Sequence, residues 1–297
     1  MNIAVKYLMI LLILIPKTVN ADVLYVHNFE RIHFLTGQET GTTKAAYDNK
    51  YIIFDVQKTY TGEWMRRFYG KEKQDRHTTI FLLDKREVRE ISWDINKILV
   101  YPLENIKNLS WLQGSIVPAT DLMSRPSSER FEVKKPVITI SKLPGIHQIG
   151  NYQCQQFKVV LLLETYDQKK QSSSITEINQ LLYLSNQVPG LSEKLESEKI
   201  LAEQLGIDTA RLGNLSSVLE YWNESLEPLR ESLNQLEGYP VKILSELYAK
   251  YIYQDKQEKK EISKLIKKEI ITLENVIEEI PEEMKTIPQD FREIFIK

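Results

Sequence analysis

Residues 78–102 read TTIFLLDKREVREISWDINKILVYP. This stretch contains three short runs rich in β-branched and aromatic residues, separated by two polar turns. The runs are 78–83, 88–93 and 97–101, and the turns are 84–86 and 94–96. Short strands joined by tight polar turns are typical of an antiparallel meander. Pro102 ends the third run because it has no N–H to donate to a neighbouring strand.

Strand patterns continue on both sides of this meander, over residues 22–188. In several runs the apolar side chains recur at every second or every fourth position, which places them on one face of a strand. These residues are Ile52, Phe54 and Val56; Tyr60, Trp64 and Phe68; and Phe157, Val159, Leu161 and Leu163. Residues 137–140 and 178–184 predict two further strands. We therefore expect most of this half of the chain to form one sheet.

The pattern changes at Pro189-Gly190, after which residues 191–236 are helical by periodicity. Leucines and one tryptophan follow alternating steps of three and four, which indicates a single apolar seam. The seam consists of Leu212, Leu215, Leu219, Trp222, Leu226, Leu229, Leu233 and Leu236. Gly238-Tyr239-Pro240 ends the helix. Residues 258–279 also favour a helix by intrinsic propensity alone.

Four segments of the chain resemble the lipoprotein-carrier-like (LolA, LppX) superfamily of bacterial periplasmic proteins, in particular its uncharacterised branch. They are the meander with its Asp84-Lys85 turn, the strand Ile149–Val159, the junction Leu184–Gly190 and the close Ile280–Phe291. Asn151 interrupts the pattern of the second segment. The resemblance implies a half-barrel whose apolar concave face is covered by the helices of 191–237. It also implies that 240–253 and 262–280 are strands, against the propensity of the second segment.

We predict an α+β fold, a curved antiparallel β-sheet (half-barrel) with a helical cover. A single LolA-like domain is expected to span residues 22–297. Within it we expect antiparallel strands over 22–188, a helical lid over 189–237, and the final strands with a C-terminal tail over 238–297.

The N-terminus predicts export. Lys6 precedes a short apolar run, Tyr7–Ile15, and small residues follow up to Ala21. These are the three parts of a secretory signal, so residues 1–21 are predicted to be cleaved. The run is too short for a spanning helix, which needs roughly 20 residues, so an uncleaved anchor is the weaker alternative. No cysteine lies at the cleavage point, and the mature protein is predicted to be periplasmic or secreted, without a lipid anchor or transmembrane segment.

Composition and motifs give no sign of catalysis or of nucleic-acid binding. The net charge of −2 offers no basic excess to neutralise phosphates. Residues 37–44 contain glycines and a lysine, but not at the spacing of a phosphate-binding loop. His27 and His33 are about 20 Å apart along a strand, and the sole cysteine, Cys154, falls in an apolar strand. We predict no enzyme, cofactor or metal, and interpret acidic pairs such as those at 278–279 and 282–283 as solvated surface.

The leading hypothesis is a carrier or binding protein for an apolar ligand such as a lipid or the acyl chain of a lipoprotein. The candidate lining residues are Trp64, Phe68, Phe157, Val159, Leu161, Leu219 and Trp222. The alternative is an envelope protein that binds another protein through the seam of 212–236 or through a sheet edge, without a ligand cavity.

Overall fold

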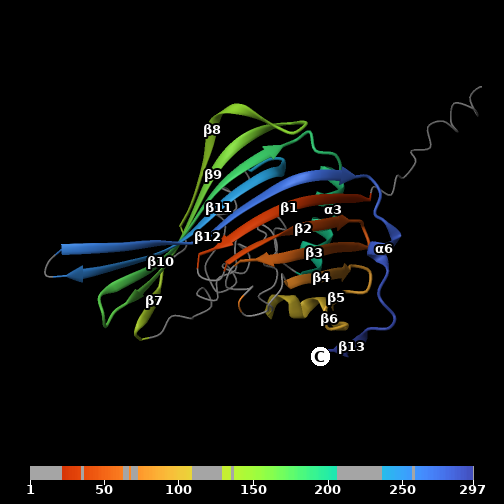
Figure 1. The fold of residues 1–297 in the computed structure, drawn as a ribbon, viewed down its shortest axis with the longest axis horizontal. Coiled ribbons are helices and arrows are strands. Elements are labelled where there is room, and N and C mark those ends of the chain that lie inside the picture. Colours follow the sequence, from red (N-terminus) through yellow and green to blue (C-terminus); the bar gives the residue numbers. More distant parts are fainter. Residues whose placement is uncertain are drawn as a thin grey trace, which may run out of the picture.

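The computed structural model describes residues 22–34, 37–62, 67, 73–108, 129–134, 137–205, 236–255 and 258–296. These residues form one 13-stranded sheet with a few short helices (Figure 1). The strands are β1 (Val23–His33), β2 (Gly37–Tyr47), β3 (Tyr51–Thr61), β4 (Lys73–Leu82), β5 (Glu87–Ser92), β6 (Lys97–Pro102), β7 (Phe131–Val133), β8 (Val137–Ile149), β9 (Tyr152–Asp167), β10 (Ser172–Ser185), β11 (Tyr239–Asp255), β12 (Glu258–Ile277) and β13 (Arg292–Phe295). The helices are the 3-10 turn η1 (Leu103–Asn108), α3 (Leu191–Leu205) and α6 (Glu282–Lys285).

The strand order is β13-β6-β5-β4-β3-β2-β1-β12-β11-β10-β9-β7, with β8 also paired to β9. All pairs are antiparallel except β13 with β6, which is parallel. The meander predicted from residues 78–102 is confirmed as β4, β5 and β6. β12 lies between the N-terminal strands and the strands β9–β11, because it pairs with β1 on one side and with β11 on the other. The sheet is thus assembled from both ends of the chain.

The predicted α+β class with a helical cover is wrong. Strands make up 69% of the described residues and helices 10%, so the protein is mostly one large open β-sheet. Strands were expected over 240–253 and 262–280, and residues 239–255 and 258–277 form the two longest strands of the sheet. The error lies in the helical share of the prediction, because strand pairing accounts for most of the described chain. Of the predicted lid at 189–237, the described helix is α3 alone, and residues 206–235, with most of the seam, lie outside the described residues.

One face of the sheet packs against α3, and we call it the inner face. Its core contains Tyr25, Tyr47 and Phe81, with the partly buried Ile200 and Leu201 of α3 packed against it. Hydrogen bonds fix the helix in its middle and at its C-terminal end: Ser197 Oγ donates to the Asp48 carbonyl (3.0 Å), and Gln204 Nε2 donates to the Leu83 carbonyl (2.9 Å). The helix therefore covers the β1–β4 part of this face, as Figure 1 also shows.

Gly190 allows α3 to start where it does. Its φ of +72° is a backbone conformation that residues with a side chain rarely adopt. A Cβ at this position would also collide with the side chain of Val23. Val23 is itself buried in the first strand. The Pro189-Gly190 junction is therefore fixed by contact with β1 as well as by backbone preference.

The opposite, outer face is covered by the C-terminal segment. Ile280 and Met284 pack on an apolar cluster that includes Leu24, Ile53 and Ile80. Further along, Phe291 contacts Trp93 edge-on, with ring centroids 5.3 Å apart. The chain then adds β13 alongside β6. Both faces of the β1–β6 region are thus buried, which accounts for the apolar character of the meander on both of its sides.

Candidate functional site

An apolar row crosses the inner face over five strands. The paired residues are Phe157 (β9), Leu182 (β10), Ile243 (β11), Ile271 (β12) and Phe29 (β1). Four of the five are at most 5% exposed, and Ile271 is partly buried. Because residues paired across neighbouring strands share a face, these side chains form one continuous strip.

Phe29 is the last residue of this row, and its ring lies over a glycine of the next strand. Gly41 of β2 is its cross-strand partner. A Cβ at Gly41 would lie 2.7 Å from Phe29 Cζ, so the ring occupies the space of a side chain there. The Arg31 guanidinium lies 4.2 Å from the centroid of the same ring. The apolar row therefore meets a charged side chain at its β1 end.

The next row, two residues further along each strand, is polar from β10 to β2. It runs from Val159 through Gln180, Ser245, Glu269 and Arg31 to Glu39. Gln180 Nε2 donates to Ser245 Oγ at 3.0 Å, and both side chains are buried. All polar members of the row have a partner, as buried polar groups require.

Arg31 is the centre of this row. Its guanidinium donates to Glu269 through Nε and to Glu39 through Nη1, the latter at 3.2 Å. His33 Nε2 lies 3.4 Å from the same Glu39 oxygen, and Lys267 Nζ lies 3.6 Å from Glu269. Burial alone raises the pKa of Glu39, but the hydrogen bond with His33 and the charge of Arg31 outweigh it and lower this pKa to about 2. Glu39 therefore stays ionised at neutral pH.

A second apolar row follows beyond the polar one. Leu161, Ile178 and Leu247 are paired across β9, β10 and β11, and they are at most 6% exposed. The next partner is Lys267 of β12, and burial lowers the pKa of its ammonium group. The inner face therefore consists of two apolar rows separated by a row of hydrogen-bonded and charged groups.

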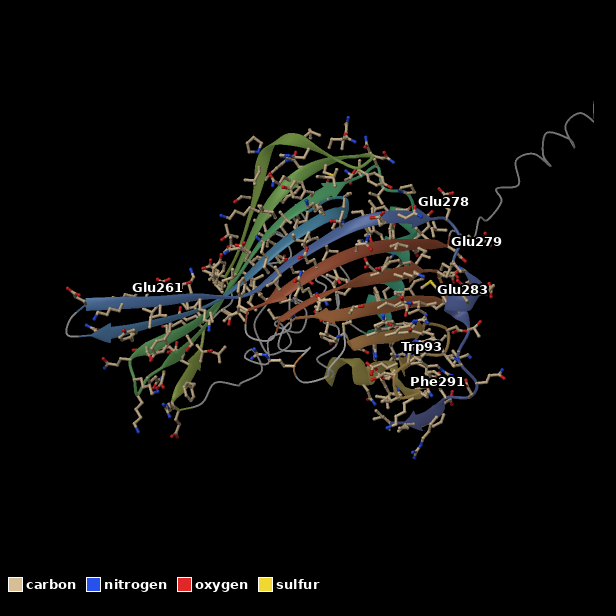
Figure 2. The ribbon with its side chains drawn as sticks, in the orientation of Figure 1. Trp93, Glu261, Glu278, Glu279, Glu283 and Phe291 are labelled. Atoms are coloured by element: carbon tan, nitrogen blue, oxygen red, sulfur yellow. The ribbon has the colours of Figure 1, made fainter. Side chains whose placement is uncertain are left out.

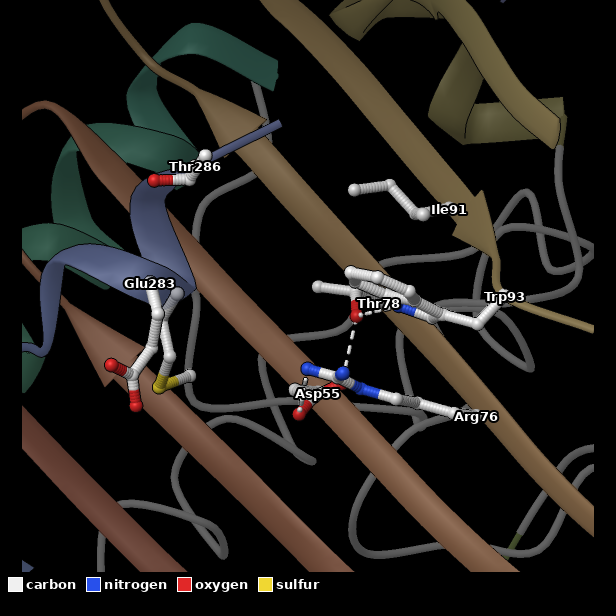
Figure 3. Close-up of a pocket in the computed structure, with 8 residues that line it drawn as sticks. Asp55, Arg76, Thr78, Ile91, Trp93, Glu283 and Thr286 are labelled. Carbon is white, nitrogen blue, oxygen red and sulfur yellow. Dashed lines mark hydrogen bonds and ion pairs between the residues drawn. The ribbon is translucent and has the colours of Figure 1, made fainter. Parts of the chain in front are cut away.

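The outer face has a small hollow of about 240 Å³, open to solvent, between β3, β4, β5 and the C-terminal segment (Figure 3). The Arg76 guanidinium donates two hydrogen bonds to the Asp55 carboxylate, from Nε at 3.0 Å and from Nη2 at 3.1 Å. Thr78 Oγ1 also donates to Asp55, at 2.7 Å. Trp93 Nε1 donates to Thr78, and its ring lies under the Arg76 guanidinium. Because each of these polar groups already has a partner in the cluster, we interpret the hollow as an attachment point for the C-terminal segment.

The structure brings together three of the seven candidate lining residues. Phe157, Val159 and Leu161 lie on one face of β9, all buried. Trp64, Phe68, Leu219 and Trp222 lie outside the described residues.

Sequence reasoning missed most of the inner face. The apolar partners on β10 and β11 carry a period-2 signal, since Ile178, Leu182, Ile243 and Leu247 each occupy alternate positions of their strands. The ion pairs of Arg31 carry no such signal, because Glu269 is 238 positions away in the sequence.

Histidine and cysteine have structural roles in the described part of the chain. His27 is buried beside Tyr239, whose Oη lies 3.0 Å from His27 Nε2. Burial lowers the pKa of His27 to about 4. Cys154 is fully buried, as predicted, and burial raises its pKa. Among the described residues, no three His, Cys, Asp or Glu side chains gather as metal ligands.

Within the same described ranges, no helix is both long and apolar enough to cross a membrane.

Comparisons with known proteins return one kind of match. No protein-family model matches the chain, and no curated protein does. Among solved structures, the chain is similar to a LolA superfamily protein from Nitrosomonas europaea, with 7% sequence identity over 91% of each chain and a TM-score of 0.28. At a TM-score of 0.28 this likeness carries no argument, so the function has to be argued from the geometry of the inner face.

Proposed function

We propose that the chain is a non-catalytic periplasmic carrier or binding protein for an apolar ligand such as a lipid or an acyl chain. The observation that supports this best is the apolar row from Phe157 to Phe29, which spans five strands of the inner face. A row of this kind matches an extended hydrocarbon chain in shape and in chemistry. The charged row lies along one of its margins.

Reversible burial is the mechanism we propose. Each methylene that leaves water for an apolar surface gains about 0.8 kcal/mol, so a long acyl chain can be held without any covalent step. Phe157, Val159 and Leu161 are the described residues that we assign to the lining. We retain the remaining four predicted residues, Trp64, Phe68, Leu219 and Trp222, as proposed members of the same lining.

We also propose that the protein reaches its site of action by export. Residues 1–21 have the composition of a secretory signal, and a single domain over 22–297 would then be the mature form. β1 starts at Val23, and its first three residues are at most 1% exposed. Export of this kind would place the carrier in the periplasm, between two membranes.

The competing hypothesis, a protein that binds partners through a sheet edge, has less support. Of the described strands, β8 pairs with β9 alone, and Val137 and Ile146 on it are exposed. However, β8 contains Pro144 and a register shift between Lys142 and Ile146. Proline and bulges on an edge strand are devices that prevent pairing with another chain.

A charge placed on the inner face tests the proposal. We expect Val159→Lys to weaken the uptake of a fluorescent fatty acid at least 10-fold, because its ammonium group would be buried against the acyl chain. Val160→Lys is the matched control, since the adjacent residue of β9 points to the other face. It should change uptake less than about 2-fold. Fluorescence titration of both purified variants measures this.

The result remains interpretable if Val159→Lys fails to fold. Val159→Thr keeps the shape of the side chain and adds one hydroxyl, and circular dichroism would show that its fold is intact. We expect it to weaken uptake several-fold relative to Val160→Thr. Equal uptake by the two threonine variants would contradict the assignment of Val159 to the lining.

A further inference from the structure

The β11–β12 hairpin extends beyond β1, its neighbour on one side. β1 pairs with β12 only as far as His33 opposite Lys267, with one more hydrogen bond from Phe34 N to the Ile266 carbonyl. The distal half of the hairpin projects away from α6, at the far end of the molecule (Figure 1). The β9–β10 turn lies beside it, because Ser172 at the start of β10 pairs with Tyr253.

The apolar inner face continues onto this hairpin. Leu247, Tyr251 and Tyr253 occupy alternate positions of β11 and therefore share a face. Leu247 is buried, Tyr251 is 36% exposed, and its cross-strand partner Ile262 is 57% exposed. The rings of Tyr251 and Tyr253 stack with centroids 5.5 Å apart. An apolar surface thus passes from the second apolar row, through Leu247, to the exterior, while the charged row lies between it and the row from Phe157 to Phe29.

Basic residues surround this exposed apolar patch. Lys169 and Lys170 in the β9–β10 turn and Lys260 and Lys264 on β12 are exposed, and the two lysines of β12 pair with Tyr253 and Ala249 on the face of Tyr251. Of the nearby carboxylates, Glu258 is exposed near the hairpin turn. Glu261 pairs with Ile252 on the opposite face, and its carboxylate lies 3.9 Å from Lys250 Nζ.

The other end of the sheet is acidic. Figure 2 shows Glu278, Glu279 and Glu283 at the end opposite the hairpin, where the C-terminal segment turns over the sheet. All three glutamates are exposed. The charge of the molecule is therefore unevenly distributed along the strand direction, and this would orient it with the hairpin toward a negatively charged surface.

We propose that the hairpin end, defined as the β9–β10 turn with residues 250–254 and 258–264, docks on an anionic lipid surface. Tyrosine side chains favour the boundary between water and hydrocarbon, and lysines near a membrane are attracted to anionic headgroups. The inference rests on the proposed carrier function, since a carrier of acyl chains has to exchange them with a membrane. The exposed patch lies where the apolar inner face reaches the outside, which suits such an exchange.

Vesicle co-sedimentation tests the docking surface. The full mature chain should sediment with vesicles of three parts phosphatidylethanolamine to one part phosphatidylglycerol, and at least 5-fold less with phosphatidylcholine vesicles. Raising the salt concentration should weaken this binding. The double variant Tyr251→Ser/Ile262→Ser should lose at least 5-fold in binding. Val137→Ser/Ile146→Ser, which removes apolar residues of β8 that are on average even more exposed, is the matched control and should bind as the unaltered chain does.

Equal binding to anionic and phosphatidylcholine vesicles would overturn the proposal, and so would equal losses of vesicle binding in the two double variants. It would also be overturned if soluble polyglutamate displaced the protein from the vesicles while Tyr251→Ser/Ile262→Ser left vesicle binding unchanged. This last result would assign the surface to an acidic protein. Fatty-acid uptake measured on the same variants separates this inference from the carrier function. If docking alone is wrong, Val159→Lys still abolishes uptake. If the carrier function alone is wrong, vesicle binding still depends on the hairpin.

Discussion

Replacing Arg31 with alanine is expected to lower the free energy of unfolding by about 3–5 kcal/mol. The side chain binds both Glu39 and Glu269, and each of these glutamate side chains is only 7% exposed. Removal of the guanidinium would leave two buried carboxylates close together without their main counter-charge. Chemical denaturation of the variant, followed by circular dichroism, measures the loss.

Arg89→Ala is a closely matched control. Arg89 also binds two glutamates, Glu87 and Glu293, and its side chain is 18% exposed compared with 20% for Arg31. The partners of Arg89 are 26% and 36% exposed, so water can solvate them when the arginine is removed. We expect a loss of about 1 kcal/mol or less. Equal losses for the two variants would show that the inner-face cluster is not buried as described.

Acidification from about pH 6.5 to pH 4 is expected to destabilise the protein through His27 by on the order of 3 kcal/mol. Burial is the main cause of its lowered pKa of about 4, and the charge of Lys194 adds to it, while a hydrogen bond with the backbone of Thr43 opposes it. The unfolded chain binds a proton at His27 from about pH 6.5 downward, whereas the folded state does not. Stability is therefore complete above this range, falls through it, and changes little from His27 below pH 4.

His27→Gln isolates this contribution. The variant removes the titrating group, so its free energy of unfolding should fall less between pH 6.5 and pH 4 than that of the unaltered chain. Glu39 contributes equally to both chains, because its own loss of stability begins near its ordinary pKa of 4.5 and continues down to its folded-state pKa of about 2. Denaturation curves at several pH values give both slopes. Parallel slopes would contradict the buried, neutral state of His27.

The meander and β9 could be predicted from the sequence because their signals are local. Residues 78–102 carry apolar alternation and turn residues at fixed spacing, and Phe157, Val159 and Leu161 alternate on one strand. Neither signal depends on how distant segments meet. The apolar face of β9 was therefore predictable, whereas its alignment with the charged residues of β1 and β12 was not.

The fold class was mispredicted because the helical periodicity of 191–236 was taken to predict a complete layer of helices over the sheet. Propensity favoured a helix for Glu258–Ile277 as well, yet this segment forms a strand paired on both sides for much of its length. Sheet pairing overrides weak local preferences in this way. The charged row was beyond sequence reasoning for a related reason: register shifts at Val26/His27 and Leu247/Tyr248 decide which residues face Arg31.

The carrier proposal is tested most directly by a native mass spectrum of the full chain after export to a bacterial periplasm and purification without detergent. We predict a population that carries about one lipid or fatty acid per protein, identified by organic extraction, and lost in Val159→Lys but not in Val160→Lys. A clean ligand-free protein that also takes up no fluorescent fatty acid would contradict the proposal.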